Sequence, residues 1–446
     1  MVAMWPHCRA SAVLRGVCRC GVGKNVSQCE GWPMGVSYYF RNFASVMEMN
    51  DNTRDFIRRH LTDDVRKLAL LSAGQEDVDV AFALCQIQGW QTARAKLPSW
   101  AEREGVVYPP HLNMEQCSSE ETACYKQRLV SRLCPGGGTM ADLTGGFGVD
   151  FSFLSRAFGR AIYVERNDEL CRLMEHNRRA LGLTNAEIRC ADCASALEEL
   201  PPLDLIFMDP ARRDGHGGKV SALRDCQPDV LSLRDTLLRK ARVLLLKLSP
   251  MLDWHEAVRQ LGCVREVHVV SVGNECKELL LVCSAERVGE ECVCCANGSQ
   301  QMAFPMAADP MEGLRMATQV AEGDYLYEPN ASVMKAGCFG RVCSDYGVGA
   351  LAHDSHLFVS SSLVGQFPGR KFRIRAVSTL NKRELRQKLS GLTQANVSVR
   401  HFPLTVAELR KRLKLRDGGD VYLFGTTFQP PGESRPSHLL LVTEKA

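Results

Sequence analysis

Acidic side chains and a glycine-rich turn mark the stretch of this sequence best suited to chemistry. Asp142 ends a short apolar run and is followed by a cluster of glycines, Gly145, Gly146 and Gly148. Glycine permits a tight turn and lets another molecule come close to the backbone. The helical stretch that follows, 149–158, would direct free N–H groups and its positive end at whatever lies there. The stretch is typical of a nucleotide-binding turn.

Three further acidic residues follow the next expected strands. Glu165 comes 17 residues after Gly148, where a carboxylate can accept two hydrogen bonds from a ribose diol. Asp192 follows the third strand, and Asp209 ends the fourth. Each residue alone could be a helix cap or a turn residue. In doubly wound sheets, however, ligands bind beyond the carboxyl ends of the strands, so we expect the four acids to surround one pocket.

The segments between these residues alternate between strand and helix patterns. Strands are expected at 139–141, 161–165, 186–190, 203–208 and 243–248, and helices at 168–181, 228–240 and 253–261. This order predicts an α/β fold with a doubly wound, Rossmann-like parallel sheet covered by helices on both faces. The last two strands, 265–272 and 278–284, are separated by too few residues for a crossover helix, which predicts an antiparallel terminal hairpin.

Composition indicates the class of protein. The chain has 446 residues, of which 45% are apolar and 24% charged, with a net charge of +4, as in globular proteins with a large core. No apolar run approaches about 18 residues, so we expect no membrane-spanning helix. Most of the 20 cysteines stand singly in apolar segments, which favours reduced thiols in a cytoplasmic enzyme. Cys190 with Cys193, and the cluster at 292–295, lack the further ligands of a zinc site, so no metal is expected.

Positive charge is concentrated near the C-terminus. Between Arg370 and Arg416 there are fourteen Lys and Arg against two Glu, so the rest of the chain carries a negative excess. A basic patch on an otherwise acidic protein is typical of nucleic-acid binding, although a solvated helix face is the alternative. Few aromatic residues stand among the basic ones, which favours contact with structured RNA or its backbone over base stacking.

Residues 114–285 resemble a class I S-adenosylmethionine-dependent methyltransferase. The pattern D-x-x-x-G-x-G of that family matches Asp142, Gly146 and Gly148, and the expected hairpin matches its reversed last strand. The resemblance implies that the glycine turn contacts the methionine part of the cofactor, that Glu165 holds the ribose and that Asp192 meets the adenine amino group. The cofactor-binding residues expected on this basis are Asp142, Thr144, Gly145, Gly146, Gly148, Glu165 and Asp192.

The chain from Met47 onward is also similar to a bacterial group of methyltransferases with ferredoxin-like and THUMP-like domains at the C-terminus. The stretches 142–150 and 209–214, and the Tyr-Glu-Pro-Asn-Ala-Ser stretch that begins at Tyr327, carry this likeness. We expect a poorly ordered extension at 1–46, a helical N-terminal domain at 47–113, the methyltransferase domain at 114–285, a connecting or ferredoxin-like segment at 286–325 and a basic THUMP-like α/β domain at 326–446.

The resemblance places Asp209 and Pro210 opposite the methyl acceptor. In amino-group methyltransferases an acidic or amide residue before a proline accepts hydrogen bonds from the target nitrogen, and an aromatic residue two places after that proline stacks on the base. This chain has Arg212 there, which could stack on a base or pair with a phosphate. Carbon methylation is disfavoured, because the cysteine nucleophile that it requires is replaced by the run that begins at Lys247.

The sequence therefore favours a methyltransferase that acts on a base nitrogen of RNA, either tRNA or rRNA. Asp209, Pro210 and Arg212 are the expected catalytic residues. The residues expected to bind the substrate are Arg213, Lys371, Arg373, Arg383 and Arg386. Two alternatives stay open: a methyltransferase for a small molecule or a protein, and a protein that binds the cofactor without turnover.

Overall fold

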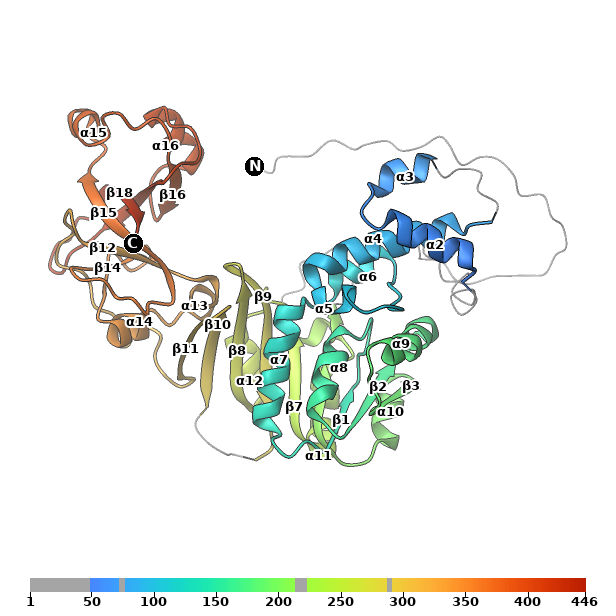
Figure 1. The fold of residues 1–446 in the computed structure, drawn as a ribbon. Coiled ribbons are helices and arrows are strands. Elements are labelled where there is room, and N and C mark those ends of the chain that lie inside the picture. The colour runs from blue at the N-terminus through green and yellow to red at the C-terminus, as the bar shows by residue number, and fades with distance from the viewer. Residues whose placement is uncertain (1–48, 72–76, 213–222, 287–290) are drawn as a thin grey trace. The chain divides into compact units, whose positions relative to one another are not determined.

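A mixed β-sheet positions the predicted pocket residues. The computed structural model describes residues 49–71, 77–212, 223–286 and 291–446, and in these residues nine strands join in the order β11-β10-β8-β9-β7-β4-β1-β2-β3 (Figure 1). The strands are β1 (Thr139–Asp142), β2 (Arg160–Glu165), β3 (Ala186–Cys190), β4 (Leu203–Met208), β7 (Ala241–Leu248), β8 (Val264–Val272), β9 (Glu275–Cys283), β10 (Cys292–Asn297) and β11 (Gln300–Pro305). From β3 to β7 all neighbours pair in parallel. The predicted extension at 1–46 lies outside the described residues.

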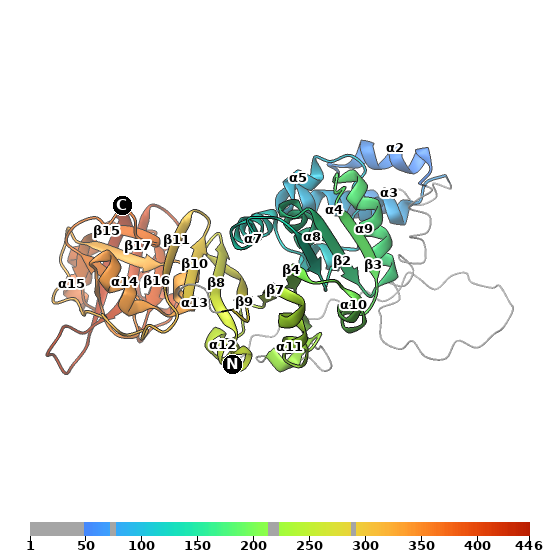
Figure 2. The same ribbon diagram turned by 90° about the horizontal axis from the view of Figure 1, so that it is seen from below.

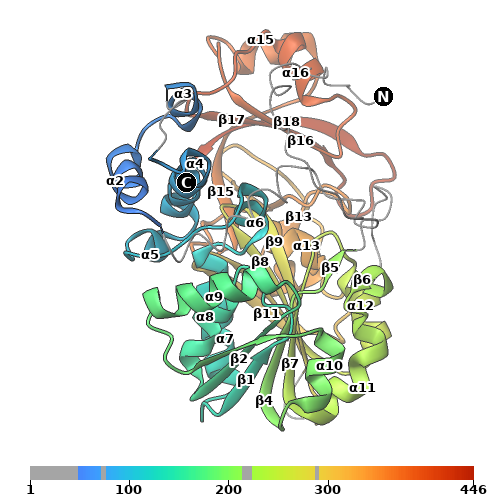
Figure 3. The same cartoon turned by 90° about the vertical axis from the view of Figure 1, so that its right-hand side faces the viewer.

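Helices cover both faces of this sheet, as the alternating pattern predicts. One face carries α7 (Glu120–Leu133), α8 (Val149–Leu154) and α9 (Asp168–Ala180), and the other carries α10 (Cys193–Glu199), α11 (Val230–Lys240) and α12 (Trp254–Leu261) (Figure 3). The strands between these layers are almost continuously apolar, and Ile206, Phe207 and Leu244 are at most 1% exposed. The doubly wound α/β fold predicted from the sequence is confirmed.

The sheet continues beyond the predicted hairpin. β8 and β9 pair antiparallel, which confirms the hairpin, and β9 also pairs antiparallel with β7. β10 then pairs in parallel with β8, and β11 pairs antiparallel with β10. The segment 286–325, expected to connect two domains, thus supplies two strands of the central sheet. Cysteines and Ala296 make up most of β10, and such small residues give a weak strand signal in a sequence.

Helices precede the sheet, and they lie within the region 47–113 that was expected to be helical, except for the end of α6. They are α2 (Asp51–His60), α3 (Val65–Leu71), α4 (Val80–Lys96), α5 (Pro98–Ala101) and α6 (His111–Gln116). Phe56 of α2 packs with Ala83 and Ile87 of α4 in a small apolar cluster. This cluster gives the helices a core of their own, separate from that of the sheet.

The extended residues Val107 and Tyr108 tie these helices to the sheet layer. Gln86 of α4 accepts a hydrogen bond from the Tyr108 N–H at 2.8 Å and donates one to the Tyr108 carbonyl at 2.9 Å. Asn177 of α9 makes the same two bonds with Val107, both at 2.9 Å. Because both amide side chains are buried, they satisfy backbone groups that water does not reach.

A second sheet occupies the C-terminal part. In the described residues seven strands join in the order β13-β14-β12-β15-β18-β17-β16. They are β12 (Tyr325–Pro329), β13 (Gly349–Ala350), β14 (Phe358–Ser360), β15 (Gly369–Ser378), β16 (Asn396–Arg400), β17 (Val421–Phe428) and β18 (Ser437–Lys445). The helices are α13 (Ala331–Ala336), α14 (Phe339–Tyr346), α15 (Lys382–Lys388) and α16 (Val406–Leu413). α13 packs against β8 and β10 of the central sheet (Figure 2), and Val333 shares a hydrophobic cluster with Val267 and Leu281.

The Tyr-Glu-Pro-Asn-Ala-Ser stretch noted in the sequence crosses from β12 to α13. Glu328 is 3% exposed and forms ion pairs with Arg370 and Arg400. Asn330 caps α13 through its side-chain oxygen and donates from Nδ2 to Gln300 Oε1 of β11 at 3.0 Å. These contacts give the stretch a structural role at the junction between the two sheets.

Replacing Gln86 by Met tests the tie through Tyr108. Met has nearly the volume of Gln but makes neither of the two buried hydrogen bonds to the Tyr108 backbone, so the free energy of unfolding should fall by about 2–4 kcal/mol. Urea unfolding followed by circular dichroism measures this change. Gln88→Met, at an exposed position of the same helix, is the matched control and should cost less than about 0.5 kcal/mol. An equal loss of unfolding free energy in both variants would contradict the stabilising role of Gln86.

Candidate active site

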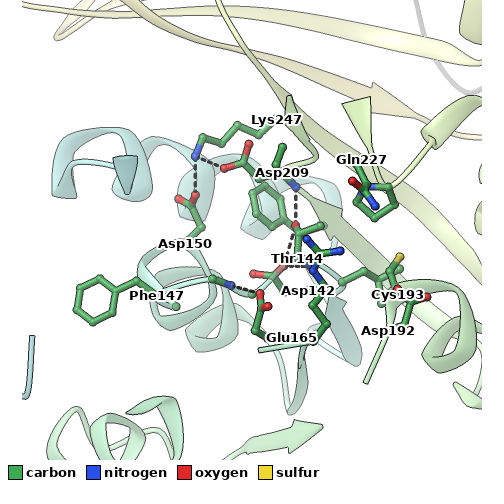
Figure 4. Close-up of a pocket in the computed structure, with 18 of the residues that line it drawn as sticks. Asp142, Thr144, Phe147, Asp150, Glu165, Asp192, Cys193, Asp209, Gln227 and Lys247 are labelled. Atoms are coloured by element: carbon green, nitrogen blue, oxygen red, sulfur yellow. Dashed lines mark hydrogen bonds and ion pairs between the residues drawn. The ribbon is translucent and has the colours of Figure 1, made fainter. Parts of the chain in front are cut away.

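One cavity of about 500 Å³ lies beyond the carboxyl ends of the parallel strands. Its lining includes the four predicted acids, Asp142, Glu165, Asp192 and Asp209, which come from the ends of successive strands (Figure 4). Because β1, β2, β3 and β4 run in the same direction, their carboxyl ends meet at one edge of the sheet. The volume lies in the range of pockets that enclose a cofactor-sized molecule.

The glycine turn lines this cavity, and two of its glycines leave no room for a side chain. A Cβ on Gly145 would lie 2.2 Å from the ring of Tyr163, and one on Gly148 would lie 2.4 Å from the sulfur of Met174. Gly148 also has φ = +84°, which only glycine adopts without strain, and it stands directly before α8. The turn therefore requires glycine at these two positions.

Thr144 joins the turn to the end of β4. Its hydroxyl accepts a hydrogen bond from the Asp209 N–H at 2.7 Å, and its own N–H donates to Asp142 Oδ1 at 3.0 Å. Asp142 is 1% exposed, and this burial raises the pKa of its carboxyl well above the ordinary value, while the Thr144 N–H lowers it in part. Thr144, predicted only from the motif, thus has a clear positioning role.

Glu165 and Asp192 combine local bonds with exposure to the cavity. Glu165 accepts from the Gly146 N–H through Oε2 and from the Asn167 N–H through Oε1, both at 2.9 Å. Asp192 caps α10 by accepting from the Ala194 N–H at 2.9 Å. The helix-cap interpretation is confirmed for Asp192; because a carboxylate has further lone pairs to offer, its binding of a ligand stays a prediction.

A chain of buried ion pairs, which sequence reasoning missed, leads to Asp209. Lys247 Nζ of β7 lies 2.6 Å from Asp209 Oδ2 and 3.2 Å from Asp150 Oδ2 at the start of α8 (Figure 4). Asp150 Oδ1 lies 3.1 Å from Lys126 Nζ of α7, which lies 2.7 Å from Glu278 Oε2 of β9. We call these five side chains the ion-pair chain. Carboxylates and ammonium groups alternate along it from Glu278 to Asp209.

Burial and partners set the charges in this chain. Burial raises the pKa of Asp150, but Lys126 and Lys247 outweigh it and bring the value down to about 2. Burial lowers the pKa of Lys247, yet Asp150 and Asp209 outweigh it and leave the value well above the ordinary one. Lys247 is therefore an ammonium ion at the cavity wall. The sequence held a signal for it, since a lysine inside the apolar run of β7 requires a buried carboxylate partner.

The other predicted residues lie elsewhere. Pro210 is buried directly after Asp209, Arg212 ends the short strand β5 (Ala211–Arg212), and Arg213 lies outside the described residues. β5 pairs antiparallel with β6 (Cys226–Gln227), a pairing that the sequence did not predict, and Gln227 lines the cavity. The predicted substrate-binding residues Lys371, Arg373, Arg383 and Arg386 stand on β15 and α15 and are not among the described residues that line the cavity.

Within the described ranges, no three or more His, Cys, Asp and Glu side chains are grouped so that they could hold a metal ion. The described helices include none that is both long and apolar enough to span a bilayer.

Family descriptions match the C-terminal part of the chain. A THUMP domain-like description matches residues 369–444, and a ferredoxin-like domain matches residues 325–368. The ferredoxin-like domain therefore lies after residues 286–325, the segment in which the sequence predicted it. A search of curated proteins finds no match.

Solved structures extend the comparison to the whole chain. The chain is similar to a protein described as a methyltransferase from Porphyromonas gingivalis W83, with 31% identity, coverage of 91% of this chain and 98% of that chain, and a TM-score of 0.77. The N-terminal domain of EvdMO1 with SAH bound matches 44% of this chain and 95% of that one at 16% identity and a TM-score of 0.31. Precorrin-6y C5,15-methyltransferase from Geobacter metallireducens GS-15 matches 43% of this chain and 96% of that one at 18% identity and a TM-score of 0.28. The last two scores support no inference about this chain.

Replacing Asp150 by Asn tests the ion-pair chain through its pH dependence. A carboxyl whose pKa is lowered on folding stabilises the protein above its unfolded pKa, and the contribution is lost as the pH falls toward the folded value of about 2. The wild type should therefore lose about 2 kcal/mol more than Asp150→Asn between about pH 4 and pH 2. Urea unfolding at several pH values measures the difference. Asp420→Asn, at an exposed position, is the control; parallel curves for wild type and Asp150→Asn would refute the ion pairing.

Proposed function

The chain belongs to the family of methyltransferases that carry ferredoxin-like and THUMP-like domains, and from this premise we propose that it transfers a methyl group from S-adenosylmethionine to RNA. A tRNA or an rRNA is the proposed substrate; the sequence alone favours a base nitrogen as acceptor, and the 2′-hydroxyl of the ribose is the other acceptor that RNA offers. The observation that carries the proposal is the convergence of the glycine turn, Glu165, Asp192 and Asp209 on one cavity.

The residues of the cavity suit this cofactor. S-adenosylmethionine has a ribose diol, an adenine amino group and a positively charged sulfur, all of which favour acidic partners. Each oxygen of Glu165 accepts one backbone N–H and has a further lone pair for a ribose hydroxyl. The exposed carboxylate of Asp192 can accept from the adenine amino group. When bound, the cofactor supplies a methyl group on a sulfonium centre, and the end of β4 holds Asp209 beside the acceptor.

Unpaired positive charge on α15 supports RNA as the substrate. Elsewhere in the C-terminal sheet acids neutralise several basic residues, since Glu328 pairs with Arg370 and Arg400. Lys382, Arg383 and Arg386 form no ion pair with any residue that the structure describes, and α15 has no buried residue. A helix whose exposed cations have no partner within the protein is suited to phosphate groups.

Glu165→Ala tests the cofactor assignment. Loss of the carboxylate should remove the charged acceptor to which the ribose hydroxyls donate, so the affinity for S-adenosylhomocysteine should fall by at least about tenfold. Isothermal titration calorimetry measures the dissociation constant. Glu199→Ala, at an exposed position of α10, should leave it unchanged. If the Glu165→Ala variant binds S-adenosylhomocysteine as tightly as the wild type, Glu165 does not hold the ribose.

A triple substitution of Lys382, Arg383 and Arg386 by Ala tests the RNA assignment. Loss of three phosphate contacts should reduce the slope of log affinity against log salt by about 2–3 and weaken binding of total tRNA at low salt. Filter binding at several salt concentrations measures both quantities.

The control for this triple variant removes three exposed basic residues outside the C-terminal sheet, Arg103, Arg239 and Lys277. It has the same net charge as the triple variant of α15. Identical salt slopes for the two variants would show that α15 has no special part in RNA binding.

A further inference from the structure

We propose that the methyl acceptor at this site is a hydroxyl group, and that in RNA it is the 2′-hydroxyl of a ribose rather than a base nitrogen. This inference rests on the proposed function, because it takes methyl transfer to RNA as its starting point. The groups that carry it are the carboxylate of Asp209 and the ammonium group of Lys247, which both line the cavity.

Asp209 presents one free oxygen to the acceptor. Its Oδ2 accepts from Lys247 at 2.6 Å, whereas its Oδ1 accepts no hydrogen bond from any residue that the structure describes. The side chain is 40% exposed and lines the cavity, so a ligand bound there can contact its carboxylate. An ionised carboxylate accepts hydrogen bonds and donates none, so its partner must carry hydrogen.

Lys247 presents a free donor beside that oxygen. Its ammonium group carries three hydrogens, and two of them bond to Asp209 Oδ2 and Asp150 Oδ2. The third has no acceptor among the described residues. The partner of Lys247 must therefore have a lone pair to offer, and it must lie beside the partner of Asp209.

The rest of the ion-pair chain fixes Lys247 in this orientation. Asp150 is held by Lys126 at 3.1 Å and by the Ser118 hydroxyl, which donates to Asp150 Oδ2 at 2.7 Å. Lys126 has no exposed surface, and it bonds to both oxygens of Glu278 at 2.7 Å. Lys247 is therefore a donor set in place before the substrate arrives, as groups that stabilise developing charge must be.

A hydroxyl oxygen satisfies both groups, whereas an amino nitrogen satisfies only one. The oxygen carries one hydrogen for Asp209 Oδ1 and two lone pairs, one for Lys247 and one to attack the methyl carbon. A base amino group can donate to Asp209, but its single lone pair is used in the attack. Lys247 would then face N–H groups and have no acceptor.

The charges favour the same acceptor. A nitrogen that gains a methyl group before it loses its proton becomes positive, and an ammonium group at hydrogen-bond distance opposes that change. A hydroxyl oxygen becomes more negative as its O–H bond weakens, and the same ammonium group stabilises it. Internal nucleotides of RNA have one hydroxyl, on the 2′ carbon of the ribose, which distinguishes RNA from DNA.

Atoms and electrons balance with these residues and the proposed cofactor. The hydroxyl proton passes to Asp209 Oδ1 as a lone pair of the oxygen forms the new O–CH₃ bond, so the oxygen does not become positive. The C–S bond breaks in the same step and its electron pair stays on the sulfur, which becomes neutral, and Asp209 then releases the proton to water.

The test uses the full-length protein, tritiated S-adenosylmethionine and total RNA from a strain that lacks the gene. We expect label in nucleosides methylated on the ribose, identified by mass spectrometry and by phosphodiester bonds that resist alkali. DNA with the sequence of a labelled RNA lacks the 2′-hydroxyl and should accept no label. The same ribose-methylated nucleoside should be present in RNA of the parent strain and missing from RNA of the deletion strain.

Lys247→Met tests the donor itself. Loss of one donor to a developing oxyanion should lower kcat by about 10²–10³-fold while S-adenosylhomocysteine affinity stays within about twofold. Lys247→Arg keeps a donor and should recover part of the rate. Lys277→Met removes an exposed lysine that pairs with Glu275 and is the matched control, with unchanged rate.

Label on a base in the wild-type reaction would overturn the hydroxyl acceptor and leave methyl transfer to RNA standing. Absence of label from all RNA, with S-adenosylhomocysteine still bound, would overturn both the inference and the proposed function. Full activity of a folded Lys247→Met variant would overturn the role given to Lys247. The identity of the labelled nucleoside comes from the wild type, so it does not depend on whether any variant folds.

Discussion

The ammonium group of Lys126 has no exposed surface, and its burial constrains much of the surrounding structure. A buried charge that loses its partner costs about 3–5 kcal/mol, so α7, α8 and β9 must keep the positions that bring Asp150 and Glu278 to it. Asp150 in turn needs a second cation because it is itself buried, and Lys247 of β7 meets that need. The same contacts that satisfy buried charges thus determine which polar atoms face the cavity.

The two halves of the cavity are joined through Thr144. Its hydroxyl accepts from the backbone of Asp209, and its amide donates to Asp142 at the end of β1. The positions of the glycine turn and of Asp209 are therefore coupled, because a shift of the turn would break the bond to the end of β4. A site that transfers a group between two ligands requires such a fixed geometry, since reaction depends on the distance and alignment of the two partners.

Sequence reasoning found what is visible locally and missed what is formed by distant residues. The acids at the strand ends, the glycine turn and the reversed hairpin each depend on a few neighbouring residues, and the structure has them as expected. Lys126 and Glu278, by contrast, are 152 residues apart, and nothing near either one indicates its partner. A lysine within an apolar strand, such as Lys247, does indicate a buried acid, but not which one.

The sequence pattern that should indicate strands β10 and β11 is weak for a different reason. Buried positions of β10 hold Val293, Cys295 and Ala296, so the contrast between its two faces is small. Strand propensity depends on how a side chain packs against neighbours, which a sequence does not display. The extension of the central sheet was therefore beyond the reach of pattern alone.

The boundary between the two matched C-terminal families falls at 368 and 369, and hydrogen bonds cross it. β12, in the ferredoxin-like match, pairs along its length with β15, in the THUMP-like match. A protein cut at that boundary would leave two unprotected strand edges, which are templates for aggregation. Gene rearrangements that separate the two parts would therefore be selected against, so the pair is expected to be inherited as a single evolutionary unit.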